Sequence, residues 1–167
     1  EKKYYLEYLY DLLDLILKKE VDRNFKFPIN KNAEVCLKKI FSENLNYVGI
    51  APGAGEKNKI WPLNNYIEIC KYLETKNYQI VFYLGPNEKG YEKILKQNFQ
   101  NAIFLENENL LNSFSNIEII MTSTKFLKFA ISNDSGVSHM LSTNYCPLIK
   151  LFGPKDSKKF TPNLKNL

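Results

Sequence analysis

The strongest constraint on the fold of this chain is the alternation of short apolar segments with helical patterns from residue 47 onward. The apolar segments comprise residues 47–51, 79–84, 102–105, 129–132 and 147–152. Helical patterns fill the intervals at residues 63–75, 89–98, 116–127 and 137–143. Apolar strands without clean alternation, each followed by a helix, are typical of a parallel sheet covered on both faces. We therefore predict an α/β fold, a Rossmann-like doubly wound parallel sheet.

Composition and charge exclude several functional classes. The 167 residues are 44% hydrophobic and 25% charged, which is ordinary for one globular domain. The net charge of +5 comes from dispersed lysines and a single arginine, Arg23, so no dense basic stripe indicates nucleic-acid binding. The charge is compatible with an anionic ligand or an anionic membrane surface.

The three cysteines are far apart and form no CxxC or metal-ligand pattern, so we expect buried free thiols. The chain has no apolar run of 18 residues and no signal-peptide pattern. We therefore expect a cytoplasmic location, and contact with the periphery of the inner membrane stays an open alternative.

Residues 1–46 are expected to contain leading helices and a connector. Residues 1–19 have the spacing of an amphipathic helix, which we expect to pack on this domain or on a neighbouring one. Membrane-surface binding is the less favoured alternative, because acidic residues lie among the lysines. A second helix is predicted at residues 32–42, with Asn32 as a candidate cap and an apolar side made of Val35, Leu37, Ile40 and Phe41.

Four loops follow the predicted strands and should share one edge of the sheet, where doubly wound folds bind their ligands. They span residues 52–61, 85–88, 133–139 and 153–156. The third loop, NDSGVSH, is a strand-to-helix turn whose free N–H groups and helix dipole favour an anion such as phosphate. The alternative is structural: Asp134 or Ser135 caps the helix, and His139, the only histidine, is a packing residue.

The first loop has neither the GxGxxG spacing of dinucleotide binders nor the GxxxxGK[ST] spacing of P-loop enzymes. Instead, PGAGEKNKIWP is followed in order by GP-x-E, NDSGVSH and LFGPKD. This ordered set resembles the C-terminal domain of glycosyltransferase family 9, the bacterial lipopolysaccharide heptosyltransferases. The resemblance covers about residues 47–157.

The resemblance implies a GT-B architecture, in which two Rossmann-like domains bind their substrates in the cleft between them. Residues 47–167 would then form the nucleotide-sugar-binding domain, with ADP-heptose as the favoured donor. The family's motif positions near the donor fall on Ala54, Gly55, Lys59, Glu88, Asp134, Ser135, Gly136 and His139. Glu88 would bind the ribose hydroxyls, and the last four residues would surround the pyrophosphate.

In this interpretation, Lys59 and the amides of Ser135 and Gly136 stabilise the charge that develops on the leaving β-phosphate. His139 would contribute if it is protonated or donates a hydrogen bond. The arrangement requires no metal and no cofactor. The structural alternatives are that Lys59 is a solvated surface charge, that Trp61 is a core residue, and that Glu88 is a helix first-turn acid.

The resemblance further implies an inverting mechanism whose general base lies in an N-terminal domain, for which residues 1–46 have no room. We therefore expect this chain alone to be inactive. The expected partners are a nucleotide-sugar donor, a lipid-linked or saccharide acceptor, and an N-terminal acceptor domain in the parent chain or in a separate protein. Lys155 replaces the family's usual threonine, and positions 54 and 55 have no hydroxyl, so the donor's identity stays open.

Two alternatives remain at this point. The first is a non-catalytic nucleotide or nucleotide-sugar binding module of the same fold. The second is another GT-B enzyme, such as an epimerase that uses a UDP-sugar, which would need additional acid/base carboxylates that the sequence does not reveal.

Overall fold

The computed structural model describes residues 5–23, 27–144 and 146–157. The chain divides into two compact units. One unit is Phe27–Gly153, and the other contains the residues up to Lys26 and those from Pro154 onward. Residues 27–46, which we grouped with the leading segment, therefore belong to the same unit as the sheet.

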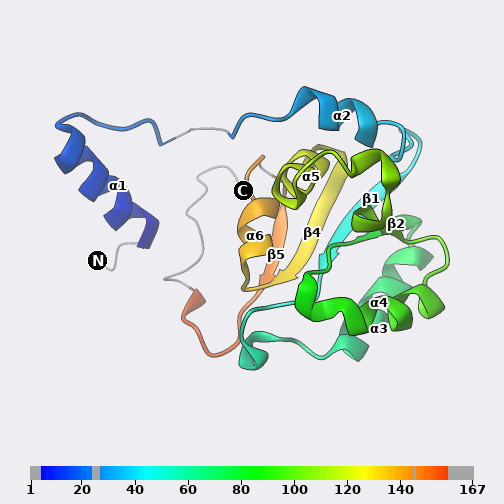
Figure 1. Cartoon of the computed structure of the whole chain (residues 1–167). Coiled ribbons are helices and arrows are strands. Elements are labelled where there is room, and N and C mark those ends of the chain that lie inside the picture. Colours follow the sequence, from blue (N-terminus) through cyan, green and yellow to red (C-terminus); the bar gives the residue numbers. More distant parts are fainter. Residues whose placement is uncertain (1–4, 24–26, 145, 158–167) are drawn as a thin grey trace. The chain divides into compact units, whose positions relative to one another are not determined.

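Phe27–Gly153 is built on a five-stranded parallel sheet with the order β3-β2-β1-β4-β5 (Figure 1). The strands are β1 (Asn46–Ala51), β2 (Tyr78–Phe82), β3 (Ile103–Phe104), β4 (Leu127–Asn133) and β5 (Leu148–Leu151). The predicted doubly wound parallel sheet is confirmed. β3 is shorter than predicted because a 3-10 turn begins at Leu105.

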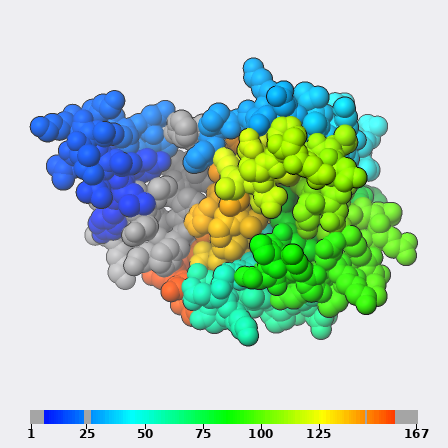
Figure 2. Space-filling model, viewed as in Figure 1, coloured from blue at the N-terminus to red at the C-terminus, as the bar shows by residue number. Residues whose placement is uncertain are grey.

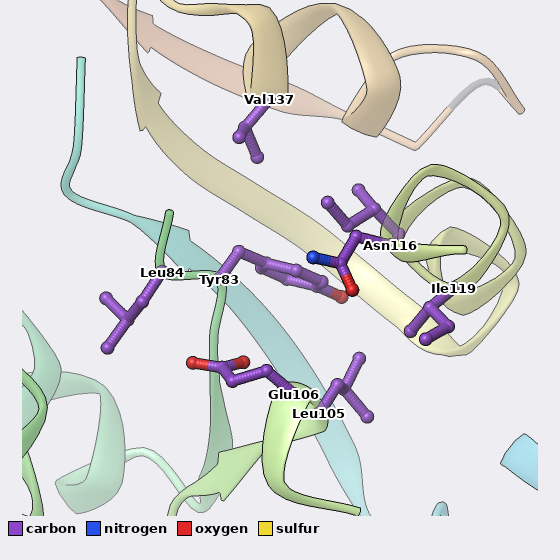
Figure 3. A pocket seen from close by; sticks show the side chains of 8 residues that line it. Tyr83, Leu84, Leu105, Glu106, Asn116, Ile119 and Val137 are labelled. Atoms are coloured by element: carbon purple, nitrogen blue, oxygen red, sulfur yellow. The ribbon is translucent and has the colours of Figure 1, made fainter. Parts of the chain in front are cut away.

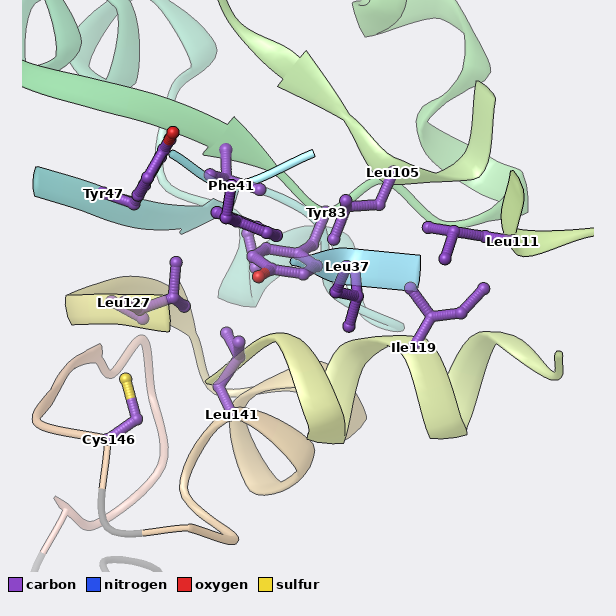
Figure 4. Close-up of a cluster of buried hydrophobic side chains, with 13 residues drawn as sticks. Leu37, Phe41, Tyr47, Tyr83, Leu105, Leu111, Ile119, Leu127, Leu141 and Cys146 are labelled. Carbon is purple, nitrogen blue, oxygen red and sulfur yellow. The ribbon is translucent and has the colours of Figure 1, made fainter. Parts of the chain in front are cut away.

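Helices cover both faces of this sheet. α3 (Leu63–Thr75) and α4 (Lys89–Asn98) lie on one face, whereas α2 (Lys31–Leu37), α5 (Asn116–Ser123) and α6 (Gly136–Leu141) lie on the other (Figure 1). Successive residues of a strand point to opposite faces, so each strand contributes to both layers. Tyr83 packs among side chains of α2 and α5 (Figure 4). Val81 belongs to the same cluster, whereas Ile80 and Phe82 pack toward α3 and α4.

Two predicted helix caps are wrong by one or two positions. Asn30, not Asn32, caps α2, because its side-chain oxygen accepts hydrogen bonds from the backbone N–H groups of Asn32 and Ala33. Ser115, not Asn116, caps α5, because Ser115 and Glu118 form a reciprocal capping box.

The buried side of α2 also differs from the prediction. Ala33 and Leu37 are fully buried, one helical turn apart, and Phe41 is buried beyond the helix end. Val35 is 58% exposed, because it lies on the opposite side of the helix from this pair. In α3, Ile67, Cys70 and Leu73 are buried and recur at the three-residue spacing of one helical face.

All three cysteines are free thiols, as expected. Cys70 and Cys146 are buried, and burial raises the pKa of Cys70 to about 12 and that of Cys146 to about 11. Cys36 is only half-buried. The two buried thiols are therefore protonated at neutral pH and behave as small core residues.

The amphipathic helix predicted near the start of the chain is α1 (Tyr5–Leu17). It ends at Lys18, whose φ of 51° is the left-handed conformation that commonly terminates helices. Asp14 then accepts hydrogen bonds from the backbone N–H of Val21 and from Arg23. The apolar stripe of α1 is exposed and includes Leu9, Leu12, Leu13 and Ile16. In the described part of the chain, every helix is too short or too polar to cross a bilayer.

Candidate functional site

The candidate site lies where the strand order reverses. The chain runs outward from β1 to β2 and β3, then returns to place β4 on the other side of β1. The loops that leave β1 and β4 therefore meet at the switch point on the carboxyl edge of the sheet, the position where ligands bind in such folds. The loop after β1 and the segment 133–139 are thus brought to the position that the sequence predicts.

Asn133, the last residue of β4, ties these two loops together. Its amide nitrogen donates to the carbonyl of Pro52 at 2.7 Å. Its amide oxygen accepts from the backbone N–H of Trp61 at 3.2 Å and from the hydroxyl of Tyr66 at 2.9 Å. The side chain is fully buried, so these bonds fix the course of the first loop.

Lys59 and Asp134, two of the predicted site residues, form an ion pair between these two loops. The Lys59 ammonium lies 3.3 Å from one carboxylate oxygen of Asp134 and 3.2 Å from the carboxylate of Glu56. The hydrogen bond to Glu56 is the main cause that raises the pKa of Lys59, burial opposes it, and Asp134 adds to it. Lys59 therefore carries its charge at all physiological pH values, and its side chain is only 17% exposed.

The structure adds Lys150, a residue that sequence reasoning missed. Its ammonium lies 2.7 Å from the other carboxylate oxygen of Asp134. Burial on its own would raise the pKa of Asp134, but Lys150 and then Lys59 outweigh it and lower that pKa below its usual value. The sequence offered no signal for Lys150, because a single lysine in the apolar segment 147–152 resembles an outward-facing strand residue.

Glu88 joins the loop after β2 to the loop after β1. One carboxylate oxygen accepts the backbone N–H of Gly85 at 2.8 Å, and the side chain is 7% exposed. A Cβ placed on Gly53 would lie 2.3 Å from the Glu88 carboxyl carbon, so only glycine allows this approach. In this structure Glu88 therefore supports the turn from Gly85 and packs on the first loop.

The loop after β5 also closes on the loop after β1. A Cβ on Gly153 would lie 2.6 Å from the carbonyl oxygen of Asn58 and 3.2 Å from the Cα of Lys59. The glycine of the LFGP motif therefore lets β5 approach the backbone that presents Lys59. Ala54 is buried in the first loop, whereas Gly55 faces open space.

The start of α6 presents the remaining predicted residues. Ser138 donates to the backbone oxygen of Ser135 at 2.7 Å, which closes the first turn. Within the described residues, the buried Ser135 hydroxyl oxygen has no hydrogen-bond partner. Figure 2 shows α6 (orange) at the surface next to the residues that follow β1 (blue-green).

Gly136 and His139 lie exposed on α6. Partial burial of the ring and then the charge of Lys150 lower the pKa of His139, and Asp134 opposes them. The lowered pKa favours the neutral ring, which can donate a hydrogen bond from its N–H group. Groups of three or more His, Cys, Asp or Glu placed to hold a metal ion do not occur among the residues that the structure describes.

A pocket lies at the same edge of the sheet, on the face covered by α5 and α6 (Figure 3). Its walls come from the ends of β2 and β3 and the starts of α5 and α6, and its lining residues are Tyr83, Leu84, Leu105, Glu106, Asn116, Ile119, Ile120 and Val137. Burial raises the pKa of Glu106, with a smaller contribution from Glu92. The sequence analysis did not identify this pocket, because its lining residues come from four separate segments of the chain.

The fold and the site together define a Rossmann-like α/β domain in which Lys59 and Lys150 pair with Asp134 at the topological switch point. The family model "Glycosyltransferase family 9 (heptosyltransferase)" matches residues 6–167, so this chain belongs to that family. It is 30% identical over 122 residues to lipopolysaccharide heptosyltransferase 2 of Salmonella typhimurium, a match that covers 71% of this chain and 34% of that protein. It is 28% identical over 163 residues to lipopolysaccharide heptosyltransferase 1 of Campylobacter coli, covering 95% of this chain and 46% of that one.

Solved structures agree on the fold. A glycosyltransferase family 9 protein from Veillonella parvula superposes with a TM-score of 0.81 at 14% identity, over 98% of this chain and 48% of that chain. E. coli heptosyltransferase WaaC with ADP-2-deoxy-2-fluoro heptose superposes with a TM-score of 0.66 at 20% identity, over 93% of this chain and 47% of that chain. This chain therefore spans about half the length of each of these two structures, and its fold is that of one half of a GT-B enzyme.

Proposed function

We propose that this chain is the donor-binding part of a glycosyltransferase. It would bind a nucleotide-diphosphate sugar, with a heptose-like sugar and ADP favoured, for transfer to lipopolysaccharide or another glycan acceptor. The observation that carries this proposal is the Lys59–Asp134 ion pair at the switch point of the sheet, beside the exposed start of α6. Two relatives named as lipopolysaccharide heptosyltransferases and a neighbour solved with an ADP-heptose analogue support the choice of donor.

The chemistry needs a site that stabilises the leaving group. When the bond from the sugar to the diphosphate breaks, negative charge develops on the β-phosphate. Lys59 and the backbone amides of Ser135 and Gly136 would stabilise that charge, since they are fixed before the reaction. His139, whose lowered pKa favours the neutral ring, would donate a hydrogen bond. The mechanism would be inverting, with the general base supplied by the acceptor-binding half.

The nucleoside would occupy the rest of the carboxyl edge. The pocket in Figure 3 combines apolar walls with the polar side chains of Glu106 and Asn116, as expected of a site for a nucleobase. Glu88, which holds the turn from Gly85, would reach the ribose hydroxyls from the neighbouring loop. Ala54 and Gly55 would allow the first loop to approach the donor closely.

Calorimetric titration of the chain with ADP, UDP and GDP tests this proposal. We expect ADP to bind best, and Lys59→Ala to weaken it by about tenfold to a hundredfold, the size of a lost charge-assisted hydrogen bond. Lys57→Ala is the matched control, because Lys57 is exposed on the same 3-10 turn (Lys57–Lys59) and carries the same charge. Folded protein that binds none of the three nucleotides would contradict the proposal.

The second candidate is a non-catalytic nucleotide-sugar binding module. This candidate rests on coverage: the matches span only 34% and 46% of the two relatives' own length, and no general base is assigned in this chain. A transfer assay with an acceptor-binding half supplied from a family relative separates the two. Sugar transfer that depends on Lys59 supports the enzyme, whereas donor binding without transfer supports the module.

A further inference from the structure

Lys150 is a buried lysine on an edge strand, where a lysine side chain would normally point to solvent. β5 lies at the edge of the sheet, and its side chains alternate between the two faces. Ile149 is 52% exposed, yet the side chain of the neighbouring Lys150 is only 7% exposed. Packing alone would favour the reverse order, because burying an ammonium group costs free energy unless its charge is compensated.

The compensation that Lys150 receives is incomplete. Asp134 offers one negative charge, and it is shared with Lys59 on its other oxygen. Lys150, Lys59 and Asp134 together therefore carry one excess positive charge, and their side chains are 7%, 17% and 10% exposed. Glu56 faces Lys59 but is 54% exposed, so solvent screens its contribution. A partly buried excess charge of this kind attracts an anion.

The hydrogen-bonding capacity of Lys150 is only partly used by Asp134. An ammonium group has three N–H donors. Apart from the close Asp134 carboxylate and the ring of Phe152, 5.1 Å away, the described residues give the buried nitrogen no hydrogen-bond acceptor of good geometry. The Ser135 hydroxyl, next to Asp134 in the chain, is the other buried polar atom without a partner among these residues.

Lys150, which pairs with Asp134 but has donors to spare, and the unpartnered hydroxyl of Ser135, the next residue in the chain, therefore both belong to the Asp134 segment of the site. Buried polar groups normally have a partner, so this pair points to a missing ligand with several acceptor oxygens. The geometry points to Lys150 as a second cation of the donor site, which binds a phosphate oxygen of the nucleotide diphosphate together with the Ser135 hydroxyl. This inference rests on the proposed function and deepens it.

The two lysines would have different roles because they lie on different elements. Lys150 is fixed on a strand and holds Asp134, so it neutralises the carboxylate before the donor arrives. Lys59 lies on the loop after β1 and keeps its charge available to the leaving phosphate. Binding of a diphosphate would then require two ammonium groups rather than one, and because both are largely buried, salt would screen this attraction less than it screens exposed charges.

Lys150→Met tests the inference, since methionine is similar in length and removes the charge. Lys128→Met is the matched control, because Lys128 is an exposed lysine at the amino end of β4, away from the loops. We expect Lys150→Met to weaken the binding of ADP and of inorganic pyrophosphate by about tenfold or more, and Lys128→Met to change neither by more than about twofold. Circular dichroism at the titration temperature verifies that both variants are folded.

A measurement on the unaltered chain covers the case in which Lys150→Met does not fold. The ammonium resonance of Lys150, assigned by its absence in Lys150→Arg, should shift on addition of ADP. Wild-type chain that binds ADP while Lys150→Met binds it equally well, or while this resonance stays unchanged, overturns the inference and leaves the proposed function standing. Wild-type chain that binds neither ADP, UDP, GDP nor pyrophosphate contradicts the proposed function itself.

Discussion

At the scale of single residues, the candidate site is governed by one carboxylate between two ammonium groups. Asp134 is held 2.7 Å from Lys150 and 3.3 Å from Lys59. Asp134 compensates the charges of these two lysines, because without it two largely buried ammonium groups would lie at one place without a counter-charge. The same arrangement leaves one positive charge for a ligand.

Asp134→Asn should therefore destabilise the fold. We expect a loss of about 3 kcal/mol in the free energy of unfolding at pH 7, the cost of removing one partner from a buried ion pair. Chemical denaturation measures this loss, and Glu43→Gln, which removes an exposed negative charge, should change stability by less than about 0.5 kcal/mol.

The difference in the free energy of unfolding between wild type and Asp134→Asn should also depend on pH, with a sign that follows from the pKa of Asp134. The folded-state pKa of Asp134 is lowered, so its ionisation stabilises the fold above the unfolded pKa of about 3.9 and this stabilisation is lost as pH falls through the folded pKa. The difference between wild type and Asp134→Asn should be constant above about pH 5 and should narrow below about pH 4. A difference that grows on acidification would show that Asp134 is not held by the lysines.

Sequence reasoning finds only part of this cluster. Lys59 and Asp134 stand in loops with recognisable motifs, so their positions at the carboxyl edge could be predicted. Lys150 could not, because its burial depends on a neighbour from another loop, and the local pattern of β5 carries no sign of it. Glu88 was predicted as a ligand residue, and its bond to Gly85 shows in addition a structural role that the GP-x-E spacing alone does not distinguish.

At the scale of elements, the site depends on loops that interlock. Asn133 joins the end of β4 to the loop after β1, Glu88 packs on Gly53, and Gly153 packs on Asn58. The sequence motifs mark these loops, but they do not reveal which atoms touch, since each contact joins segments far apart in the chain. The predicted cap of α5 was wrong for a different reason. Both Ser115 and Asn116 are residue types that cap helices, and only the reciprocal hydrogen bonds between Ser115 and Glu118 decide between them.

Gly153→Ala should test the interlock directly. Its Cβ would lie 2.6 Å from a backbone oxygen, so the loop that presents Lys59 must move. We expect a loss of about 1–3 kcal/mol in the free energy of unfolding, together with weaker ADP binding. Thermal and chemical denaturation and calorimetry measure the two effects.

Gly90→Ala is the control for that variant. An added Cβ at Gly90 meets nothing within 4 Å, and the residue lies in α4. It should leave ADP binding unchanged and stabilise the fold by about 0.5–1 kcal/mol, because alanine is the better helix former. Equal behaviour of the two alanine variants would contradict the interlocking of the loops.

At the scale of the whole molecule, the sequence predicts the fold well because one pattern dominates it. Strands buried on both faces alternate with amphipathic helices, and this periodicity leaves few topologies. The strand order itself, and hence the switch point between β1 and β4, comes from tertiary pairing that local periodicity does not encode. The apolar stripe of α1 is exposed. That it packs on this domain or on a neighbouring domain, rather than on a membrane, stays a prediction.

The whole-molecule account makes one central claim, that a nucleotide diphosphate binds at the carboxyl edge of this sheet. Mapping the backbone amide shifts of the chain during titration with ADP tests it most directly. We predict that the shifts concentrate in residues 53–59, 85–88, 105–106 and 133–139, whereas amides at the amino edge, such as those of Tyr78 and Lys128, stay in place. Saturable shifts confined to other surfaces, or no shifts at millimolar ADP, would contradict the claim.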